Sequence, residues 1–154
     1  MTPDGSYPDM SFARTSDEKC NVLCCGYSRF VRGQVSDKPK YVEIKPRPHQ
    51  RLEECLASDD PNTICDALYS AAQHEQDWRW SQTHCLKLLN HESSLVRSAA
   101  LIALGEIALF RGHLDLEVVL PEIKRFATDP ALGAFVEDAL DNIRVSKVEG
   151  ADKV

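Results

Sequence analysis

One pattern occurs three times between residues 48 and 145, and each copy consists of two expected helices joined by a short polar turn. The second helices of the copies align at spacings of roughly 32 and 36 residues, within the range of helical-hairpin repeats. Small residues recur in these helices, which allows neighbouring helices to approach closely. Two sets of residues share a register position, namely Ala67, Ala99 and Phe135, and Ala71, Ala103 and Ala139. The sequence therefore predicts a mainly all-α fold, a stack of about three helical hairpins.

The turns carry residues that favour helix starts. Pro61 and Pro130 each stand at the expected first position of a second helix, where the missing N–H has no helical partner to lose. Asp60 and Asp129 precede them as expected N-caps, and Ser93 has the same place in the middle copy. The middle second helix has a broad apolar stripe, which predicts burial on most sides between neighbouring copies.

The chain outside the repeats has a different composition. Residues 1–47 form an expected N-terminal extension, partly disordered, with a β-hairpin predicted near 30–35 and 40–45 around the turn sequence SDKP. Residues 48–145 are the predicted repeat domain. Residues 146–154 are polar and are expected to form a flexible tail.

Charge is distributed unevenly along the 154-residue chain. Residues 1–47 have eight Lys and Arg against six Asp and Glu, a net charge of +2, whereas residues 48–154 have ten against eighteen, a net charge of −8. The acidic region would repel a phosphate backbone and attract a basic protein, so we expect a protein partner and no nucleic acid. No apolar run of about 18 residues is present. The N-terminus lacks the features of a secretory signal, so we expect no membrane contact and a cytoplasmic location.

The stretch SSLVRSAALIALGEIA resembles the second helix of a HEAT repeat. The matching positions are Val96–Arg97, Ala99–Ala100 and Leu104–Gly105. The resemblance extends over about two-thirds of the chain, and the segments DWRWSQTHCLKLLNH and GAFVEDALDNI are similar to a group of small bacterial HEAT proteins. Some members of that group resemble immunity proteins encoded beside polymorphic or contact-dependent toxins.

This resemblance implies a structural role for Arg97, because the equivalent arginine in HEAT repeats pairs with acidic residues in the turns. It does not supply functional polar residues. Glu106 and Leu109 occupy positions where the family often has His and Arg.

Two His-Glu pairs, His74–Glu75 and His91–Glu92, are the candidates for metal ligands, since some HEAT-like hydroxylases bind di-iron through such pairs. The first pair ends a second helix and the other lies in a turn, so they would not face one another. We expect both pairs to be solvated turn residues, and we expect neither a metal nor a cofactor. The six cysteines lack zinc-site spacing, and Cys55, Cys65 and Cys85 are expected to be buried thiols.

The two tryptophans fall on different helical rows. Trp78 shares a row with Gln82, Cys85 and Leu89, which predicts that it is part of the core. Trp80 lies roughly 200° away around the helix, where it either joins the core or contacts a partner.

Acidic residues cluster on the last predicted helix. They form a solvated face, a docking patch for a basic partner or, with no pocket signature to support it, an acid–base site. Asp66, Glu106 and Arg111 lie on the second helices, which line the concave side of HEAT stacks. The predicted partner-binding residues are Trp80, Asp66, Glu106, Arg111, Glu137, Asp138 and Asp141.

The favoured function is protein binding, in the form of an immunity protein that occludes a basic toxin such as a nuclease. No catalytic motif is present, and we expect no enzymatic activity. The alternatives are a HEAT-repeat adaptor without a toxin partner, and a HEAT-type enzyme such as a lyase or a DNA glycosylase. The acidic repeats disfavour the glycosylase, which needs a cationic face. The sequence does not indicate an oligomeric state.

Overall fold

The computed structural model describes residues 43–154, of which Ile44–Val154 form one compact unit. The N-terminal extension expected over residues 1–47 therefore lies largely outside the described residues, as does most of the predicted β-hairpin. Residues 43–48 have no regular secondary structure. Lys45 and Ile44 already belong to the folded unit, because their carbonyl oxygens bond to the Ser70 hydroxyl at 2.9 Å and the His74 ring at 2.6 Å.

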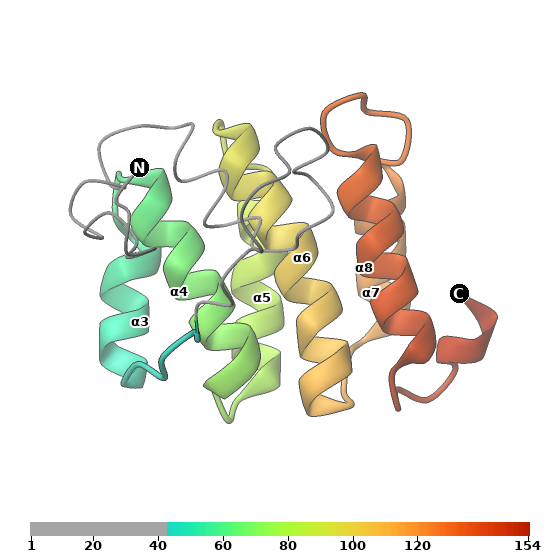
Figure 1. Ribbon diagram of the computed structural model, residues 1–154, viewed down its shortest axis with the longest axis horizontal. Helices are drawn as coiled ribbons and strands as arrows, with labels where there is room; N and C mark the ends of the chain where they lie inside the picture. The colour runs from blue at the N-terminus through green and yellow to red at the C-terminus, as the bar shows by residue number, and fades with distance from the viewer. Residues whose placement is uncertain (1–42) are drawn as a thin grey trace, which may run out of the picture. The chain divides into compact units, whose positions relative to one another are not determined.

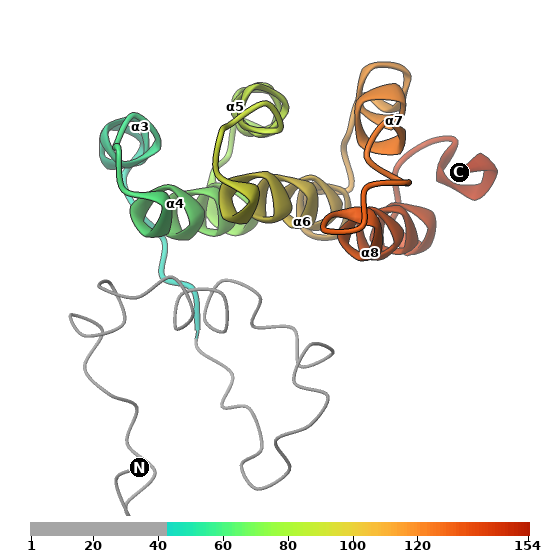
Figure 2. The ribbon, with the colours of Figure 1, turned by 90° about the horizontal axis from the view of Figure 1, so that it is seen from above.

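The unit is built from three helical hairpins. The first helices of the hairpins are α3 (His49–Leu56), α5 (Trp78–Leu88) and α7 (Leu116–Lys124). The second helices are α4 (Pro61–His74), α6 (Ser94–Arg111) and α8 (Gly133–Val145). The second helices lie side by side in one layer (Figure 1), and the first helices form another layer (Figure 2). The predicted all-α stack of three hairpins is confirmed.

Two of the three hairpins begin their second helix where the sequence predicts. Asp60 caps α4 as expected: its carboxylate accepts hydrogen bonds from the backbone N–H groups of Asn62 at 3.3 Å and Thr63 at 3.0 Å. Pro61 is the first residue of that helix. Ser93 precedes α6, although its side chain makes no capping hydrogen bond.

The third hairpin differs from the prediction. Helix α8 begins at Gly133, not at Pro130, and Asp129 stabilises a turn by accepting the Ala131 N–H at 2.8 Å. A Cβ atom on Gly133 would lie 2.9 Å from the carbonyl oxygen of Ala127. The chain therefore folds back tightly on the segment after α7 before the helix starts, which only a residue without a side chain permits.

Helix α6 forms the centre of the stack. It packs against α4 on one side, α8 on the other and α5 in the second layer. Every residue from Ser98 to Ala108 is buried, which confirms the predicted burial of this helix on most sides. An α-helix exposes no free backbone donors along its length, so its middle turns can be enclosed without unpaired N–H groups.

A glycine also marks a close approach between two helices, α6 and α8. A Cβ atom added to Gly105 would lie 3.0 Å from Ala139 Cα and 3.2 Å from Asn142 Cβ. Ala139 belongs to the small-residue register that the sequence analysis identified, and it is fully buried. The two backbones therefore meet at a glycine and an alanine.

The C-terminal segment is folded, which corrects the expectation of a flexible tail over residues 146–154. Val148 and Ala151 are buried, and a short 3-10 helix, η2, covers Ala151–Lys153. Arg144 of α8 donates to the Val154 carbonyl oxygen from two nitrogens at 3.2 Å each. The polar composition of the segment obscured the two small apolar residues that attach it to the stack. No helix within residues 43–154 has the length and apolar character to cross a bilayer.

We predict that Gly105→Ala lowers the free energy of unfolding and that Gly105→Val lowers it further. Overpacking costs roughly 1–3 kcal/mol, and because the added Cβ would press on the backbone of Ala139 we expect this cost to exceed the gain of about 1 kcal/mol in helix propensity from Gly to Ala. Urea unfolding measures the effect, and Glu92→Ala, at an exposed turn, should change stability by less than about 0.5 kcal/mol. A more stable Gly105→Ala variant would contradict the close approach of α6 and α8.

Candidate partner-binding surface

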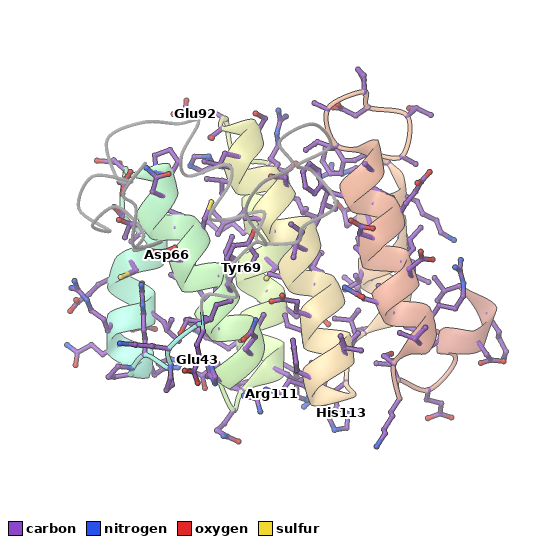
Figure 3. All side chains as sticks on the ribbon, viewed as in Figure 1. Glu43, Asp66, Tyr69, Glu92, Arg111 and His113 are labelled. Carbon is purple, nitrogen blue, oxygen red and sulfur yellow. The ribbon has the colours of Figure 1, made fainter. Side chains whose placement is uncertain are left out.

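The predicted partner-binding residues lie on four helices. Asp66 is on α4 (Figure 3), and it forms an ion pair with Arg47 at 3.6 Å. Arg111 is the last residue of α6, and its buried Nε has no hydrogen-bond partner. Trp80 is on α5, and three acids are on α8. These side chains therefore do not share one helix face.

The acids on α8 provide the most accessible negative charge of the predicted set. Glu137 and Asp141 are exposed and Asp138 is half-buried. Asp141 accepts a hydrogen bond from Arg144 at 2.6 Å, one turn further along the helix. This pair is exposed on both sides and contributes little to stability, so Asp141 can exchange its partner at small cost.

Glu106 is placed differently from the prediction. Its side chain is on α6 as expected, but only 3% of the residue is exposed, so it cannot serve as a surface contact. Gln73 of α4 donates a hydrogen bond to its carboxylate at 3.3 Å. Burial raises the pKa of Glu106 to about 7, and the Gln73 hydrogen bond opposes that shift. The carboxyl group thus links α4 and α6 inside the stack.

Trp80 is half-buried between two histidine rings. The ring centroids of His49 and His84 lie 4.5 Å and 4.2 Å from that of Trp80. His49 also contacts the Glu75 carboxylate at 2.8 Å, and this hydrogen bond raises the pKa of His49. Of the two roles that the sequence left open, the structure favours packing, because Trp80 joins α3 to α5.

The His-Glu pairs have no shared site. His74 bonds to the Ile44 carbonyl oxygen and Glu75 to His49, so this pair is half-buried and hydrogen-bonded, not solvated as expected. His91 accepts the Ser93 N–H at 3.1 Å in its turn. Within residues 43–154, no group of three or more His, Cys, Asp or Glu side chains is arranged to hold a metal ion.

The three cysteines of the described region are buried, free thiols, as the sequence predicts. They are Cys55, Cys65 and Cys85. Burial raises the pKa of the Cys85 thiol, which keeps it protonated and unreactive.

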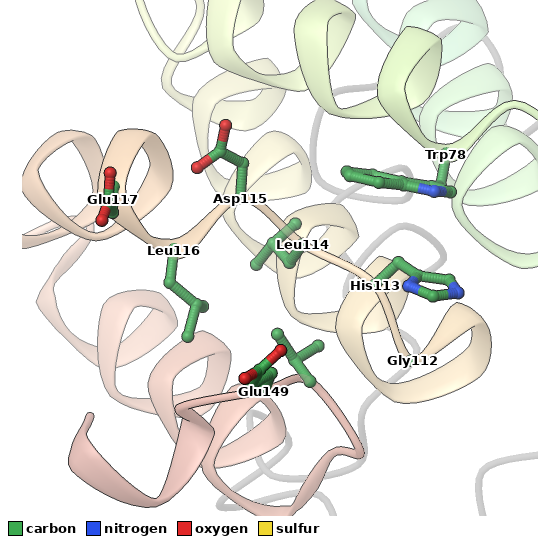
Figure 4. A pocket seen from close by; sticks show the side chains of 9 residues that line it. Trp78, Gly112, His113, Leu114, Asp115, Leu116, Glu117 and Glu149 are labelled. Atoms are coloured by element: carbon green, nitrogen blue, oxygen red, sulfur yellow. The ribbon is translucent and has the colours of Figure 1, made fainter.

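A cavity of about 350 Å³ lies where the α6–α7 connection meets the C-terminal segment (Figure 4). Sequence reasoning missed it because Trp78 was assigned to the core and residues 146–154 to a loose tail. Trp78 is instead half-buried and forms one wall of the cavity. The remaining wall residues are Gly112, His113, Leu114, Asp115, Leu116, Glu117, Val148 and Glu149.

Comparisons with known proteins agree with an architecture of helical repeats. Residues 82–110 match the family model of the HEAT repeat, so the predicted resemblance to HEAT-repeat proteins is confirmed. The chain is similar to one in the crystal structure of a CDI complex from Cupriavidus taiwanensis LMG 19424, with 27% sequence identity and a TM-score of 0.65. The similarity covers 72% of this chain and 100% of that chain. No curated protein sequence gives a significant match.

We predict that Glu106 makes stability fall as pH rises. The pKa is about 7 in the folded protein and near 4.5 for an ordinary glutamate, so the folded state holds the proton more tightly. The stability that the protonated Glu106 gives the folded state is therefore fully present below pH 4.5 and is lost as the pH rises from 4.5 to 7. As the pH rises from 5 to 8, the free energy of unfolding of Glu106→Gln should increase relative to that of wild type by roughly 1–3 kcal/mol. Urea unfolding at each pH measures this difference.

The matched control for this measurement is Glu137→Gln, which removes an exposed carboxylate from α8. Its stability difference from wild type should stay nearly constant over the same pH range. A flat difference for Glu106→Gln as well would show that the Glu106 carboxyl group is solvated.

Proposed function

We propose that this HEAT-repeat protein is an immunity protein that binds a basic toxin domain and blocks it in the cytoplasm of the producing cell. The observation that carries the proposal is the similarity to a chain of a CDI (contact-dependent inhibition) complex over the whole length of that chain. A HEAT repeat supports the coarser conclusion, a protein-binding module, because stacked hairpins present extended surfaces to partners.

Charge supports a basic partner. Residues 48–154 contain ten Lys and Arg and eighteen Asp and Glu, so their net charge is −8. A surface of one sign speeds the arrival of an oppositely charged protein. Glu137 and Asp141, both exposed on α8, fit this role best among the predicted contacts, with Asp138 between them. We assign Glu106 no part in docking, because it is buried.

Inhibition would act by occlusion. Carboxylates on the immunity protein take the place of the phosphates that a nuclease toxin attracts, and the rigid helical stack excludes the substrate. In this account the chain itself catalyses no reaction. An adaptor without a toxin partner has the same fold and surface, so experiment must separate the two functions. A glycosylase-like enzyme fits poorly, since an acidic surface repels DNA.

The test begins with co-expression. The gene adjacent to that of this protein is expressed with and without it, and the immunity function predicts that growth is restored only with it. Binding kinetics with a catalytically inactive form of the same toxin domain then test the surface. Failure to bind that domain at any salt concentration would remove the immunity function and leave an adaptor.

We predict that the double variant Glu137→Gln, Asp141→Asn slows association roughly three- to tenfold at low salt and flattens its salt dependence. The dissociation rate should change less, because steering acts before contact. The control is Asp59→Asn, Glu92→Gln, which removes two exposed acids from turns and changes the net charge equally. Equal slowing by both double variants would show that net charge, not the α8 surface, drives association.

A further inference from the structure

We propose that the cavity beside Trp78 receives an arginine side chain of the protein partner. This inference rests on the proposed function, since it assumes a basic protein partner, and it names the chemistry of one contact. Three properties of the cavity support it: walls held in place before binding, an aromatic surface, and carboxylates that form no ion pair within residues 43–154.

The walls of the cavity are fixed by buried residues. Leu114 is 7% exposed and Val148 is 8% exposed, so both are packed against the stack. Gln82 of α5, itself buried, accepts the Asp115 N–H at 2.8 Å and ties the α6–α7 connection to the first-helix layer. Gly112 has a φ of 65°, a left-handed conformation that ends α6 and turns the chain toward the cavity. A preformed site loses little entropy when it binds.

The aromatic wall suits a guanidinium group. The rings of Trp78 and His113 are nearly parallel, at 17°, and their centroids are 5.6 Å apart, which is an offset stack that leaves part of the indole face uncovered. The guanidinium of Arg79 already lies over the Trp78 ring, 4.4 Å from its centroid, although Arg79 does not line the cavity. The contact with Arg79 shows that the Trp78 indole can stack with a guanidinium group.

The carboxylates supply the charge. Asp115, Glu117 and Glu149 line the cavity, and all three are exposed. Within residues 43–154, none of them forms an ion pair with a basic side chain. The apolar side chains of Leu114, Leu116 and Val148 would contact the methylene groups of the incoming residue. The N-terminus of α7 lies here, and helix N-termini favour anions. The three acids nevertheless make an anionic ligand unfavourable, because they would repel it.

Arginine fits this combination better than lysine. Its planar guanidinium stacks on aromatic rings, binds carboxylates through a fork of donors and is more weakly hydrated than an ammonium group. The aromatic wall and the carboxylates of this open cavity match the first two of these properties.

The test uses the tryptophan indole N–H resonances of the full chain. The protein contains two tryptophans, so a ¹H–¹⁵N spectrum shows two indole signals, and Trp78→Phe assigns them. The probe is N-acetyl-arginine methylamide, with the N-acetyl-norleucine analogue as an uncharged control. We expect a saturable shift of the Trp78 signal at millimolar probe, little change at Trp80, and no saturable shift with norleucine.

The carboxylate requirement is tested in the same titration. The double variant Asp115→Asn, Glu149→Gln should bind the arginine probe roughly three- to tenfold more weakly. The variant Asp59→Asn, Glu92→Gln, which has the same net charge, should bind it as wild type does. An unchanged Trp78 signal, or an equal response to norleucine, would overturn the proposal.

A parallel measurement separates this proposal from the proposed function. The inactive toxin domain from the adjacent gene should displace the arginine probe, and Asp115→Asn, Glu149→Gln should dissociate from that domain faster. If the toxin binds wild type and the double variant equally well, the cavity assignment is wrong and the immunity function stands. If the toxin does not bind wild type at all, the immunity function is wrong, and the probe titration still decides whether the cavity binds arginine.

Discussion

The contact between α6 and α8 at Gly105 and Ala139 is the constraint on which the rest of the structure depends. A Cβ atom at residue 105 would lie 3.0 Å from the Ala139 Cα, closer than ordinary side-chain contacts, so the glycine allows the two backbones to approach this closely. Helix α6 is then enclosed by α4, α5 and α8, and its residues from Ser98 to Ala108 leave the solvent. This burial converts three marginal hairpins into one stack, because no hairpin could bury its apolar face alone.

The surface available for function follows from this packing. With α6 enclosed, accessible acids remain on α8, on the connection after α6 and on the C-terminal segment, among other places. Gln82 holds that connection to α5, and Val148 holds the segment to the stack, so the carboxylates near Trp78 are placed on a rigid support. The described residues include no arrangement of three or more potential metal ligands, and among their exposed charged side chains acids outnumber Lys and Arg. Such a surface is suited to binding a basic protein.

The sequence predicted what local spacing determines. The recurrence of Ala71, Ala103 and Ala139 is a repeat in the sequence, and the cap at Asp60 depends on its immediate neighbours, so both could be recognised without coordinates. Contacts between distant residues could not. Glu106 was predicted to face a partner, but its burial depends on the neighbouring helices. Trp78 and Trp80 were assigned from one helix alone, while the rings that pack on them lie elsewhere: His113 follows α6 and His49 is on α3.

Hydrogen exchange of the protein with and without the inactive toxin domain tests the central claim, that a rigid stack presents an acidic surface at its C-terminal hairpin. We expect the amides of α6 to exchange most slowly in both states. Binding should add protection at residues 112–117, at residues 147–150 and along α8, and should leave α3 unchanged. Protection confined to α3 and α4, or a general slowing that includes the amides of α6, would contradict this account.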